Sequence, residues 1–294
     1  MHQWTIQKLL TWSAEYFQGR RVDSPRATAE TLLSHCLNQS RLELYTQFDK
    51  PLNETELSRF KSLIKRRVRR EPVAYITGAK GFWDLDLKVT PDVLIPRPET
   101  ERLVENALAF LSDMENPKGS NYSLRILELG TGSGAVILSI ASACSGHRYY
   151  ASDRSLGALA VALENARIHD PESAVHFFSG DWFGPLSRSG GKFDLILSNP
   201  PYIKRGDIDG LQPEIVWFEP KAALDGGHDG LDAIRHIILR AHLFLNPGGG
   251  LLLEIGHDQK ESVRTIAVET GRYGNILFFK DYCGIDRVVQ MTRR

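Results

Sequence analysis

The stretch that decides the fold is Arg125-Ile126-Leu127-Glu128-Leu129-Gly130-Thr131-Gly132-Ser133-Gly134-Ala135. Its first half is a short apolar run typical of a buried strand, and its second half spaces three glycines ahead of an apolar run that ends near Ala143. Glycine lets the backbone turn sharply and lets a ligand lie against N–H groups at a helix start. The stretch therefore predicts a strand, a ligand-binding turn and a helix over 133–143.

Strand-like and helix-like segments continue to alternate after this unit, as in an open α/β sheet with helices on both faces. The expected helices cover 156–168, 233–244 and 259–270, and the further strands cover 148–151, 175–178, 193–197, 250–255, 276–280 and 287–292. We therefore expect a Rossmann-like α/β domain over residues 96–294, with a seven-stranded sheet.

The chain before this domain has a different pattern. Residues 1–72 have helical periodicity, with Gly19 ending one helix, Ser24-Pro25 starting the next and a capping box at Asn53-Glu54-Thr55-Glu56. They predict a small helical bundle. Residues 73–95 predict a linking β-hairpin, with Gly78 and Gly81 in its turns, and residues 116–123 predict a loop.

Composition limits the function. The chain has 294 residues, and its 36 basic residues balance 36 acidic ones, so it lacks the basic excess of proteins that bind nucleic acid mainly through phosphates. The one dense basic run is Lys65 to Arg70, which fits a solvated helix end or a contact for an acidic or RNA-associated partner. Direct nucleic-acid binding is not expected.

The scattered cysteines and the short apolar runs argue against a disulfide-rich, zinc-binding, secreted or membrane-spanning protein. Three scattered cysteines form neither a disulfide framework nor a zinc pattern, and the nine histidines show no ligand spacing beside them. The N-terminus lacks the apolar core of a signal peptide, and no apolar run approaches the ~20 residues of a membrane span. We expect a cytoplasmic protein that is monomeric, has no metal site and does not bind membranes.

Three stretches at the carboxyl ends of neighbouring strands indicate a nucleotide-like ligand. The glycine turn alone also satisfies the dinucleotide fingerprint, so an oxidoreductase stays open at this point. Asp153, about 20 residues further on, has the place of a ribose-binding carboxylate or of a helix cap. Trp182, after the third strand, suits an adenine cover or a core aromatic.

The motif Asn199-Pro200-Pro201-Tyr202 favours methyl transfer over redox chemistry. It holds no proton donor for hydride transfer, but the Asn199 side-chain carbonyl and the Pro200 carbonyl can accept two hydrogen bonds from one amino group. Tyr202 offers a face for a flat amide or base. The target is therefore a planar amide or nucleobase nitrogen.

With these motifs the chain resembles the class I S-adenosylmethionine-dependent methyltransferases, and within them the HemK/PrmC family of release factor glutamine N5-methyltransferases. The residues that carry the closer resemblance lie at 70–78, 94–101, 180–183 and 218–227, and it covers nearly the whole chain. One departure is Asp84, where the family typically has glycine after Phe82-Trp83. It places the turn of the hairpin in question.

The resemblance implies a role for each motif. S-adenosylmethionine would be bound by Gly130, Thr131, Gly132, Ser133, Gly134, Asp153, Trp182 and Asn199. Asn199, Pro200, Pro201 and Tyr202 would bind the target glutamine, with Asn199, Pro200 and Tyr202 taking part in catalysis. The substrate would be the Gly-Gly-Gln glutamine of class I peptide chain release factors, and residues 1–72 would recognise that protein.

Because the motif contains no strong base, catalysis by position is expected. Arg97, between two prolines, is held toward the site or belongs to a helix-entry turn. Glu254 assists a proton or is a buried paired carboxylate, and residues 225–230 form a mobile or a plain surface loop. Alternatives are an adenine or cytosine amino methyltransferase, a ribosomal-protein glutamine methyltransferase that resembles the chain less around Arg97, and a non-catalytic adapter.

Overall fold

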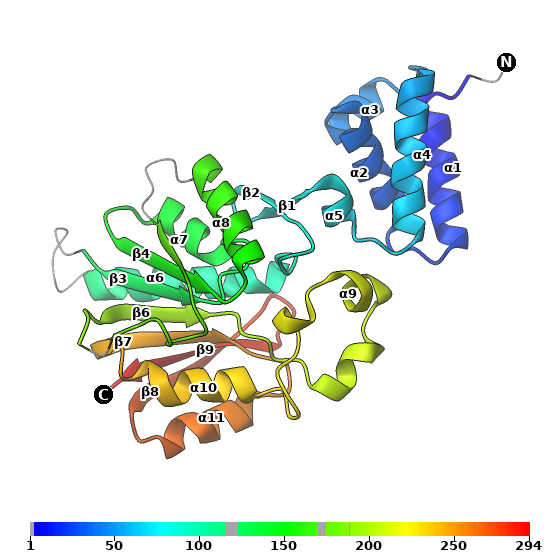
Figure 1. The fold of residues 1–294 in the computed structure, drawn as a ribbon. Helices are drawn as coiled ribbons and strands as arrows, with labels where there is room; N and C mark the ends of the chain where they lie inside the picture. Colours follow the sequence, from blue (N-terminus) through cyan, green and yellow to red (C-terminus); the bar gives the residue numbers. More distant parts are fainter. Residues whose placement is uncertain (1–2, 116–122, 170–174, 188) are drawn as a thin grey trace. The chain divides into compact units, whose positions relative to one another are not determined.

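The computed structural model describes residues 3–115, 123–169, 175–187 and 189–294 (Figure 1). The chain divides into two compact units: residues 1–79 with 212–218, and residues 80–211 with 219–294. The predicted loop at 116–123 lies almost wholly outside the described residues. Each unit is considered by itself.

The first unit is helical. It contains α1 (Ile6–Gly19), α2 (Pro25–Leu37), α3 (Arg41–Thr46), α4 (Glu54–Val68), α5 (Val73–Thr77) and α9 (Pro213–Phe218). Its core is formed by apolar side chains from α1 to α5 and the loops between them, with Ile6, Phe17 and Phe60 almost completely buried. The helical bundle predicted for residues 1–72 is present, and the short helix α3 was not predicted.

Of the two helix N-termini predicted in this unit, one has the expected cap and the other does not. Asn53 and Glu56 form the predicted capping box, each side chain accepting a hydrogen bond from the other's backbone N–H. Pro25 is the first residue of α2 as predicted, but Ser24 has a left-handed conformation, with φ +45°, and caps no N–H group. Ser24 therefore precedes α2 without stabilising it through its hydroxyl.

The basic run Lys65 to Arg70 is engaged within the helical unit. Arg67, buried at 4% exposure, donates to Glu214 Oε1 at 2.8 Å, and Arg70 reaches the same oxygen at 3.3 Å. Arg66 pairs with Glu71 and donates to the Tyr75 and Ile76 carbonyls. Three of the arginines therefore stabilise the unit, and the run is not simply a solvated helix end.

The second unit is built on a seven-stranded sheet in the order β5-β4-β3-β6-β7-β9-β8. The strands are β3 (Arg125–Leu129), β4 (Arg148–Asp153), β5 (Val175–Ser179), β6 (Phe193–Ser198), β7 (Leu245–Glu254), β8 (Tyr273–Lys280) and β9 (Asp286–Arg293). The pairs among β3 to β7 are parallel, and β9 pairs antiparallel with both β7 and β8. This is the predicted Rossmann-like sheet.

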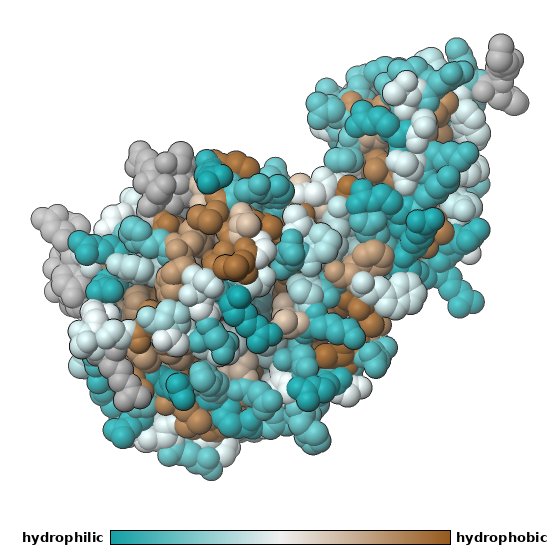
Figure 2. Space-filling view, viewed as in Figure 1, coloured by the Kyte–Doolittle hydropathy of each residue, from teal (hydrophilic) through white to brown (hydrophobic). Residues whose placement is uncertain are grey.

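Helices cover both faces of the sheet (Figure 1). Side chains of α6 (Glu101–Glu115), α7 (Ala135–Ala143) and α8 (Leu156–His169) join one core, and those of α10 (Asp232–Ala241) and α11 (Lys260–Glu269) join the other. Successive strand residues point to opposite faces: Ile126 lies in the first core and Leu127 in the second. Polar residues cover most of the face in Figure 2, with apolar residues in small separate groups.

The hairpin differs from its prediction. Its strands are β1 (Ala79–Phe82) and β2 (Leu85–Lys88), whereas residues 73–77 form the helix α5 and not a strand. A four-residue apolar run does not distinguish strand from helix by its period, and Gly78, at φ +75°, ends α5. Gly81 lies inside β1 and not in a turn. The hairpin therefore covers 79–88 of the predicted 73–95.

The turn of this hairpin accommodates Asp84. Trp83 takes the left-handed conformation, with φ +53°, while Asp84 has no positive φ. The Glu101 carboxylate accepts a hydrogen bond from Trp83 N at 3.0 Å and holds the turn. The position where the family typically has glycine therefore does not require one here.

Three short helical segments without a sequence prediction follow the Asn199 motif: η2 (Arg205–Gly210), α9 and η3 (Lys221–Ala223). Among the described residues, no helix is long and apolar enough to cross a membrane. In the same part of the chain no group of three or more His, Cys, Asp or Glu side chains could hold a metal ion.

Candidate active site

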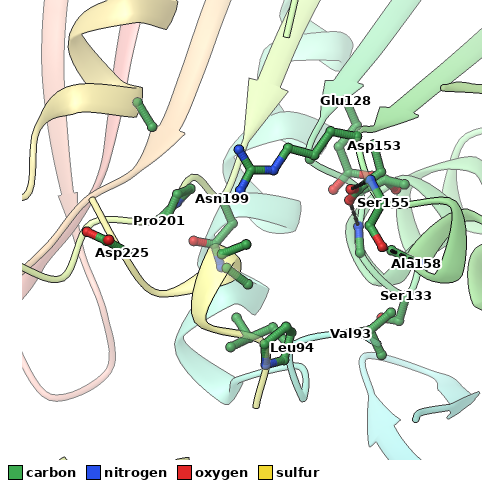
Figure 3. Close-up of a pocket in the computed structure, with 18 of the residues that line it drawn as sticks. Val93, Leu94, Glu128, Ser133, Asp153, Ser155, Ala158, Asn199, Pro201 and Asp225 are labelled. Atoms are coloured by element: carbon green, nitrogen blue, oxygen red, sulfur yellow. Dashed lines mark hydrogen bonds between the residues drawn. The ribbon is translucent and has the colours of Figure 1, made fainter. Parts of the chain in front are cut away.

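The predicted motifs meet at the carboxyl ends of β3, β4, β5 and β6. A cavity of about 620 Å³ is lined there by residues of the sheet-containing unit, among them Gly130, Asp153, Trp182 and Asn199. Figure 3 shows Glu128, Asp153 and Ser155 on one side of the cavity, with Asn199 and Pro201 on the other. Ligands bind at this edge in open α/β sheets.

The glycine turn is shaped by its backbone. Gly130, Gly132 and Gly134 have φ values of +71°, +56° and +83°, a region that side chains rarely tolerate. The N–H groups of Gly130 and Thr131 donate to the Ser152 carbonyl at 2.8 and 2.9 Å, which fixes the turn against the end of β4. Gly130, Thr131, Gly132 and Ser133 line the cavity, whereas Gly134 caps α7.

Asp153 accepts two backbone hydrogen bonds at the end of β4. One carboxylate oxygen accepts from Ser155 N at 2.8 Å, just before α8, and the other accepts from Gly132 N at 2.9 Å. The side chain thus caps a turn and links it to the glycine turn. It is half-buried in the cavity wall, and each oxygen retains a lone pair for a ligand hydroxyl.

Trp182 packs against the core as one of its two interpretations predicted, and it also lines the cavity. It has a left-handed backbone, with φ +48°, and its half-buried ring packs against the apolar core while lining the cavity. A side chain at position 130 would have its Cβ 3.7 Å from this ring, so the ring lies directly over Gly130. The ring therefore covers the glycine turn at Gly130.

Glu128 was quoted in the sequence without a role, and it is a functional candidate. It is almost completely buried at the end of β3, where it accepts hydrogen bonds from Thr131 Oγ1 at 2.5 Å and Ile137 N at 3.3 Å. Burial raises the pKa of Glu128 to about 8, against the opposing effect of these donors. The sequence signal for it was an acidic residue inside an otherwise apolar strand, two positions before the first glycine, Gly130.

The side-chain amide of Asn199 uses its NH₂ group in a hydrogen bond within the protein, whereas its carbonyl oxygen is free among the described residues. Its side-chain Nδ2 donates to Thr100 Oγ1 at 3.1 Å. Its carbonyl oxygen Oδ1 makes no hydrogen bond with the residues that the structure describes, and the side chain lines the cavity. Thr100, 4% exposed, also lines the cavity, and sequence reasoning assigned it no role.

The rest of the motif lies differently around the cavity. Pro201 lines it, whereas Pro200 is buried and neither Pro200 nor Tyr202 belongs to the described lining. The Tyr202 hydroxyl donates to Glu254 Oε1 at 3.2 Å. Burial, with the Glu254 charge beside it, raises the pKa of Tyr202 above its ordinary value, so this hydroxyl is not a base near neutral pH.

Glu254 is a buried carboxylate at the end of β7. Burial raises the pKa of Glu254 to about 7, while Thr100, Arg287 and Tyr202 favour its ionised form. Its Oε2 makes no hydrogen bond of standard geometry among the described residues. Glu254 is absent from the cavity lining, so its contact with the site runs through Tyr202 and Thr100.

Arg97 and Glu219 form an ion pair beside the cavity. Arg97 lines the cavity and donates to Glu219 Oε1 at 2.6 Å, and the Glu219 side chain is 1% exposed. The other Glu219 oxygen accepts from Ile95 N at 3.3 Å. Arg97 is thus held at the site by a carboxylate that lies 122 residues away in the sequence.

The predicted loop at 225–230 is anchored at several points. The Gly226 N–H donates to the Ile203 carbonyl at 2.8 Å, and Gln259 Nε2 donates to the Gly230 carbonyl at 3.0 Å. Asp225 pairs with Arg205, and both line the cavity. The segment therefore contributes Asp225 to the cavity wall, and hydrogen bonds hold it near both of its ends.

Comparison with known proteins identifies the family. Residues 8–78 match the PrmC N-terminal domain family, and residues 102–217 match the methyltransferase small domain family. The release factor glutamine methyltransferase of Geobacter sulfurreducens is 42% identical over 97% of this chain and 96% of that protein. The one of Vibrio cholerae is 45% identical over 97% of this chain and 95% of that protein. The chain belongs to the release factor glutamine methyltransferase family.

The structural comparison agrees in fold. A methyltransferase from Pyrococcus furiosus superposes with a TM-score of 0.50, at 19% identity, over 78% of this chain and 98% of that one. At this identity the likeness shows the fold alone. As a member of its family, the chain is a class I S-adenosylmethionine-dependent protein-glutamine methyltransferase, as its motifs predicted.

The cavity fits this cofactor. Its volume of about 620 Å³ lies within the range of small-molecule sites. The glycine backbone beside the Trp182 ring has no side chains that would block a flat group such as a purine. The Asp153 carboxylate oxygens can accept hydrogen bonds from ribose hydroxyls. The apolar Val136 and Ala158 complete the wall on the same side.

Proposed function

We propose that this chain transfers a methyl group from S-adenosylmethionine to the side-chain amide nitrogen of the glutamine in the Gly-Gly-Gln motif of class I peptide chain release factors. The observation that carries the proposal is the Asn199 amide. Its Nδ2 is engaged by Thr100 while its Oδ1 has no partner among the described residues, in the cavity that fits the cofactor. Such an oxygen is free to accept a hydrogen bond from a substrate NH₂ group.

The glycine turn and its neighbours are proposed to hold the cofactor. Gly130, Thr131, Gly132, Ser133 and Gly134 would hold the methionine part, Asp153 the ribose and Trp182 the adenine region, with Asn199 at the boundary to the substrate. When bound, the cofactor supplies a methyl group already activated by a sulfonium. No base is then needed to activate the donor.

The motif 199–202 is proposed to hold the target glutamine. The Asn199 Oδ1 and the Pro200 carbonyl accept the two hydrogens of the amide NH₂, which turns the nitrogen lone pair toward the cavity. Pro201 forms part of the wall, and Tyr202 is held by Glu254 behind it. Tyr202 acts as a support whose hydroxyl stays protonated, and the substrate proton leaves to water.

The remaining features are proposed to serve substrate recognition. Residues 1–72 would recognise the release factor, residues 73–95 link them to the catalytic domain over 96–294, and the protein would act as a cytoplasmic monomer. Direct nucleic-acid binding is not part of the proposal. The engagement of Arg66, Arg67 and Arg70 in ion pairs supports this, because it leaves few free cations in the basic run.

A transfer assay tests the proposal. The protein is incubated with methyl-labelled S-adenosylmethionine and, separately, with a release factor, the same factor with Ala at the Gly-Gly-Gln glutamine, a ribosomal-protein substrate, and duplex DNA. We expect label on the unaltered release factor only. Label on DNA, on the ribosomal protein, or equally on the altered factor would overturn the proposal.

A further inference from the structure

Thr100 is placed to decide which end of the Asn199 amide faces the substrate. Its hydroxyl oxygen accepts from Asn199 Nδ2 at 3.1 Å, and the two residues come from elements 99 positions apart in the chain. Thr100 is the last residue of η1 (Pro98–Thr100) and is 4% exposed, so the surrounding structure fixes its side chain. It lines the same cavity as Asn199.

The orientation of an amide follows from the group that it faces. An Asn side chain rotated by 180° exchanges its donor NH₂ for its acceptor carbonyl at nearly unchanged shape. A hydroxyl accepts from the NH₂ or donates to the carbonyl, so a threonine alone does not fix the choice. A further group must fix the direction of the Thr100 proton.

Glu254 is that further group. Its buried carboxylate lies next to Thr100, which stabilises the ionised form, and it accepts from the Tyr202 hydroxyl through Oε1. Oε2 has no hydrogen bond of standard geometry among the described residues, so it is the acceptor available to the Thr100 proton. In its ionised form, which predominates above its pKa of about 7, Glu254 only accepts hydrogen bonds. A Thr100 proton directed to Glu254 would leave the hydroxyl oxygen to accept from Asn199, which is the arrangement of the 3.1 Å contact between them.

We propose that Thr100 is a positioning residue that orients Asn199 with its carbonyl toward the substrate amide, and that Glu254 fixes the direction of this hydrogen-bond chain. The inference rests on the proposed function and deepens it. In the flipped orientation, the Asn199 NH₂ would face the substrate NH₂, so two donors would meet and no hydrogen bond would form.

Three variants test the proposal. Thr100→Val keeps the shape and removes the hydroxyl, Thr100→Ser keeps the hydroxyl, and Thr265→Val makes the same change on the exposed face of α11. We expect Thr100→Val to lower kcat about tenfold, because one oriented hydrogen bond is lost. The KM for release factor should stay within about twofold, Thr100→Ser should recover most of kcat, and Thr265→Val should resemble the wild type.

A second measurement separates orientation from damage to the cofactor site. The affinity for S-adenosylhomocysteine, measured by calorimetry, should match the wild type in Thr100→Val, and the melting temperature should fall by only several degrees, because one buried hydrogen bond is lost. A loss seen mainly in cofactor affinity, or a Thr100→Ser no better than Thr100→Val, would overturn the proposal. So would a Thr100→Val with full kcat.

A double-mutant cycle gives the sharpest outcome. If Thr100 acts only through Asn199, Thr100→Val should have no further effect on kcat in an Asn199→Ala background. Additive losses would overturn the proposal. The activity of the wild type distinguishes the two hypotheses. If the wild type does not methylate a release factor, the proposed function is wrong. If the wild type methylates it and Thr100→Val does so equally well, the proposed role of Thr100 is wrong.

Discussion

At the scale of single residues, the site depends on which polar atoms have partners and which do not. Both oxygens of Asp153 accept backbone hydrogen bonds, and the Tyr202 hydroxyl is bound to Glu254. The Asn199 carbonyl oxygen has no partner among the described residues. A buried or half-buried acceptor that the protein does not use is available to a ligand, which supports the proposal that Asn199 orients the substrate amide.

Replacing Asn199 by alanine should remove this orientation. We expect Asn199→Ala to lower turnover on a release factor by more than about tenfold, because the acceptor acts where positive charge develops on the nitrogen. The measurement is single-turnover methyl transfer, with S-adenosylhomocysteine affinity as the control that should change little. A variant with full turnover would contradict the assignment.

Glu128 should make stability depend on pH. Its pKa is raised by burial from 4.5 to about 8, and it faces the Thr131 hydroxyl, Ile137 N and the Asp153 carboxylate. The folded protein therefore binds a proton that the unfolded chain has lost between pH 4.5 and 8, so stability falls as pH rises through this range. The slope for one such group reaches about 1.4 kcal/mol per pH unit.

Urea unfolding of the cofactor-free protein between pH 5 and 9, for wild type and Glu128→Gln, measures this effect. The variant keeps the shape and loses the titration, so its stability should fall less between pH 5 and 8. Glu254, with a pKa raised by burial to about 7, adds a slope of the same sign up to that pH. Because Glu254 is present in both proteins, its slope cancels in the difference between them, and that difference reports Glu128 over pH 5 to 8. Parallel curves would show that Glu128 does not titrate in this range.

At the scale of elements, contacts distant in the sequence hold the segments that surround the site. Asn165 of α8 bonds the backbone of Lys88 at 2.7 and 3.0 Å and the Ser133 carbonyl at 2.8 Å, which ties β2 to the glycine turn. In the helical unit, α9 is held to α4 through Glu214 and Arg67. Each of these contacts depends on a buried polar side chain, and removing that side chain would leave a buried hydrogen-bonding or charged partner unsatisfied.

Removal of Glu214 should destabilise the helical unit. In Glu214→Ala, the Arg67 guanidinium stays buried without a counter-charge, and such breaks cost about 3 kcal/mol or more. Thermal and urea unfolding measure the effect. The matched control is Glu164→Ala, which breaks the exposed pair with Lys88 and should cost about 1 kcal/mol or less. Equal effects in the two variants would contradict a structural role for the Arg67–Glu214 pair.

At the scale of the whole molecule, the two compact units have different proposed tasks. The glycine turn, Asp153, Trp182 and Asn199 all belong to the unit formed by residues 80–211 and 219–294. The cofactor should therefore be bound by one unit only, and protein recognition is left to the other.

Hydrogen exchange tests this division. Saturating S-adenosylhomocysteine should slow exchange in peptides that contain Gly130, Asp153 and Asn199, and at 100 times its Kd it should stabilise that unit by about 2.7 kcal/mol. Peptides from residues 8–78 should be unchanged until a release factor is added. Protection of those peptides by the cofactor alone, or their indifference to the release factor, would contradict the division.

The sequence predicts the sheet well and the segments around it less well. The strands at 125–129 and 193–197 were predicted nearly to the residue because a buried parallel strand is a continuous apolar run. Residues 73–77 were predicted wrongly as strand, since a short apolar run fits both periods. The contacts of Thr100 and Glu128 at the cavity were not predicted, because they involve partners that are not visible in a single sequence.

By itself, the sequence determined the α/β sheet, the glycine turn and the placement of the Asn199-Pro200-Pro201-Tyr202 motif after a buried strand, because each depends on local rules: apolar periodicity, positive φ at glycine and a proline that cannot donate. Only the tertiary structure decided which end of the Asn199 amide is free, that Tyr202 is bound to Glu254, and that much of the basic run is engaged. These follow from hydrogen bonds and ion pairs between residues far apart in the chain, which burial makes decisive and which no local pattern encodes.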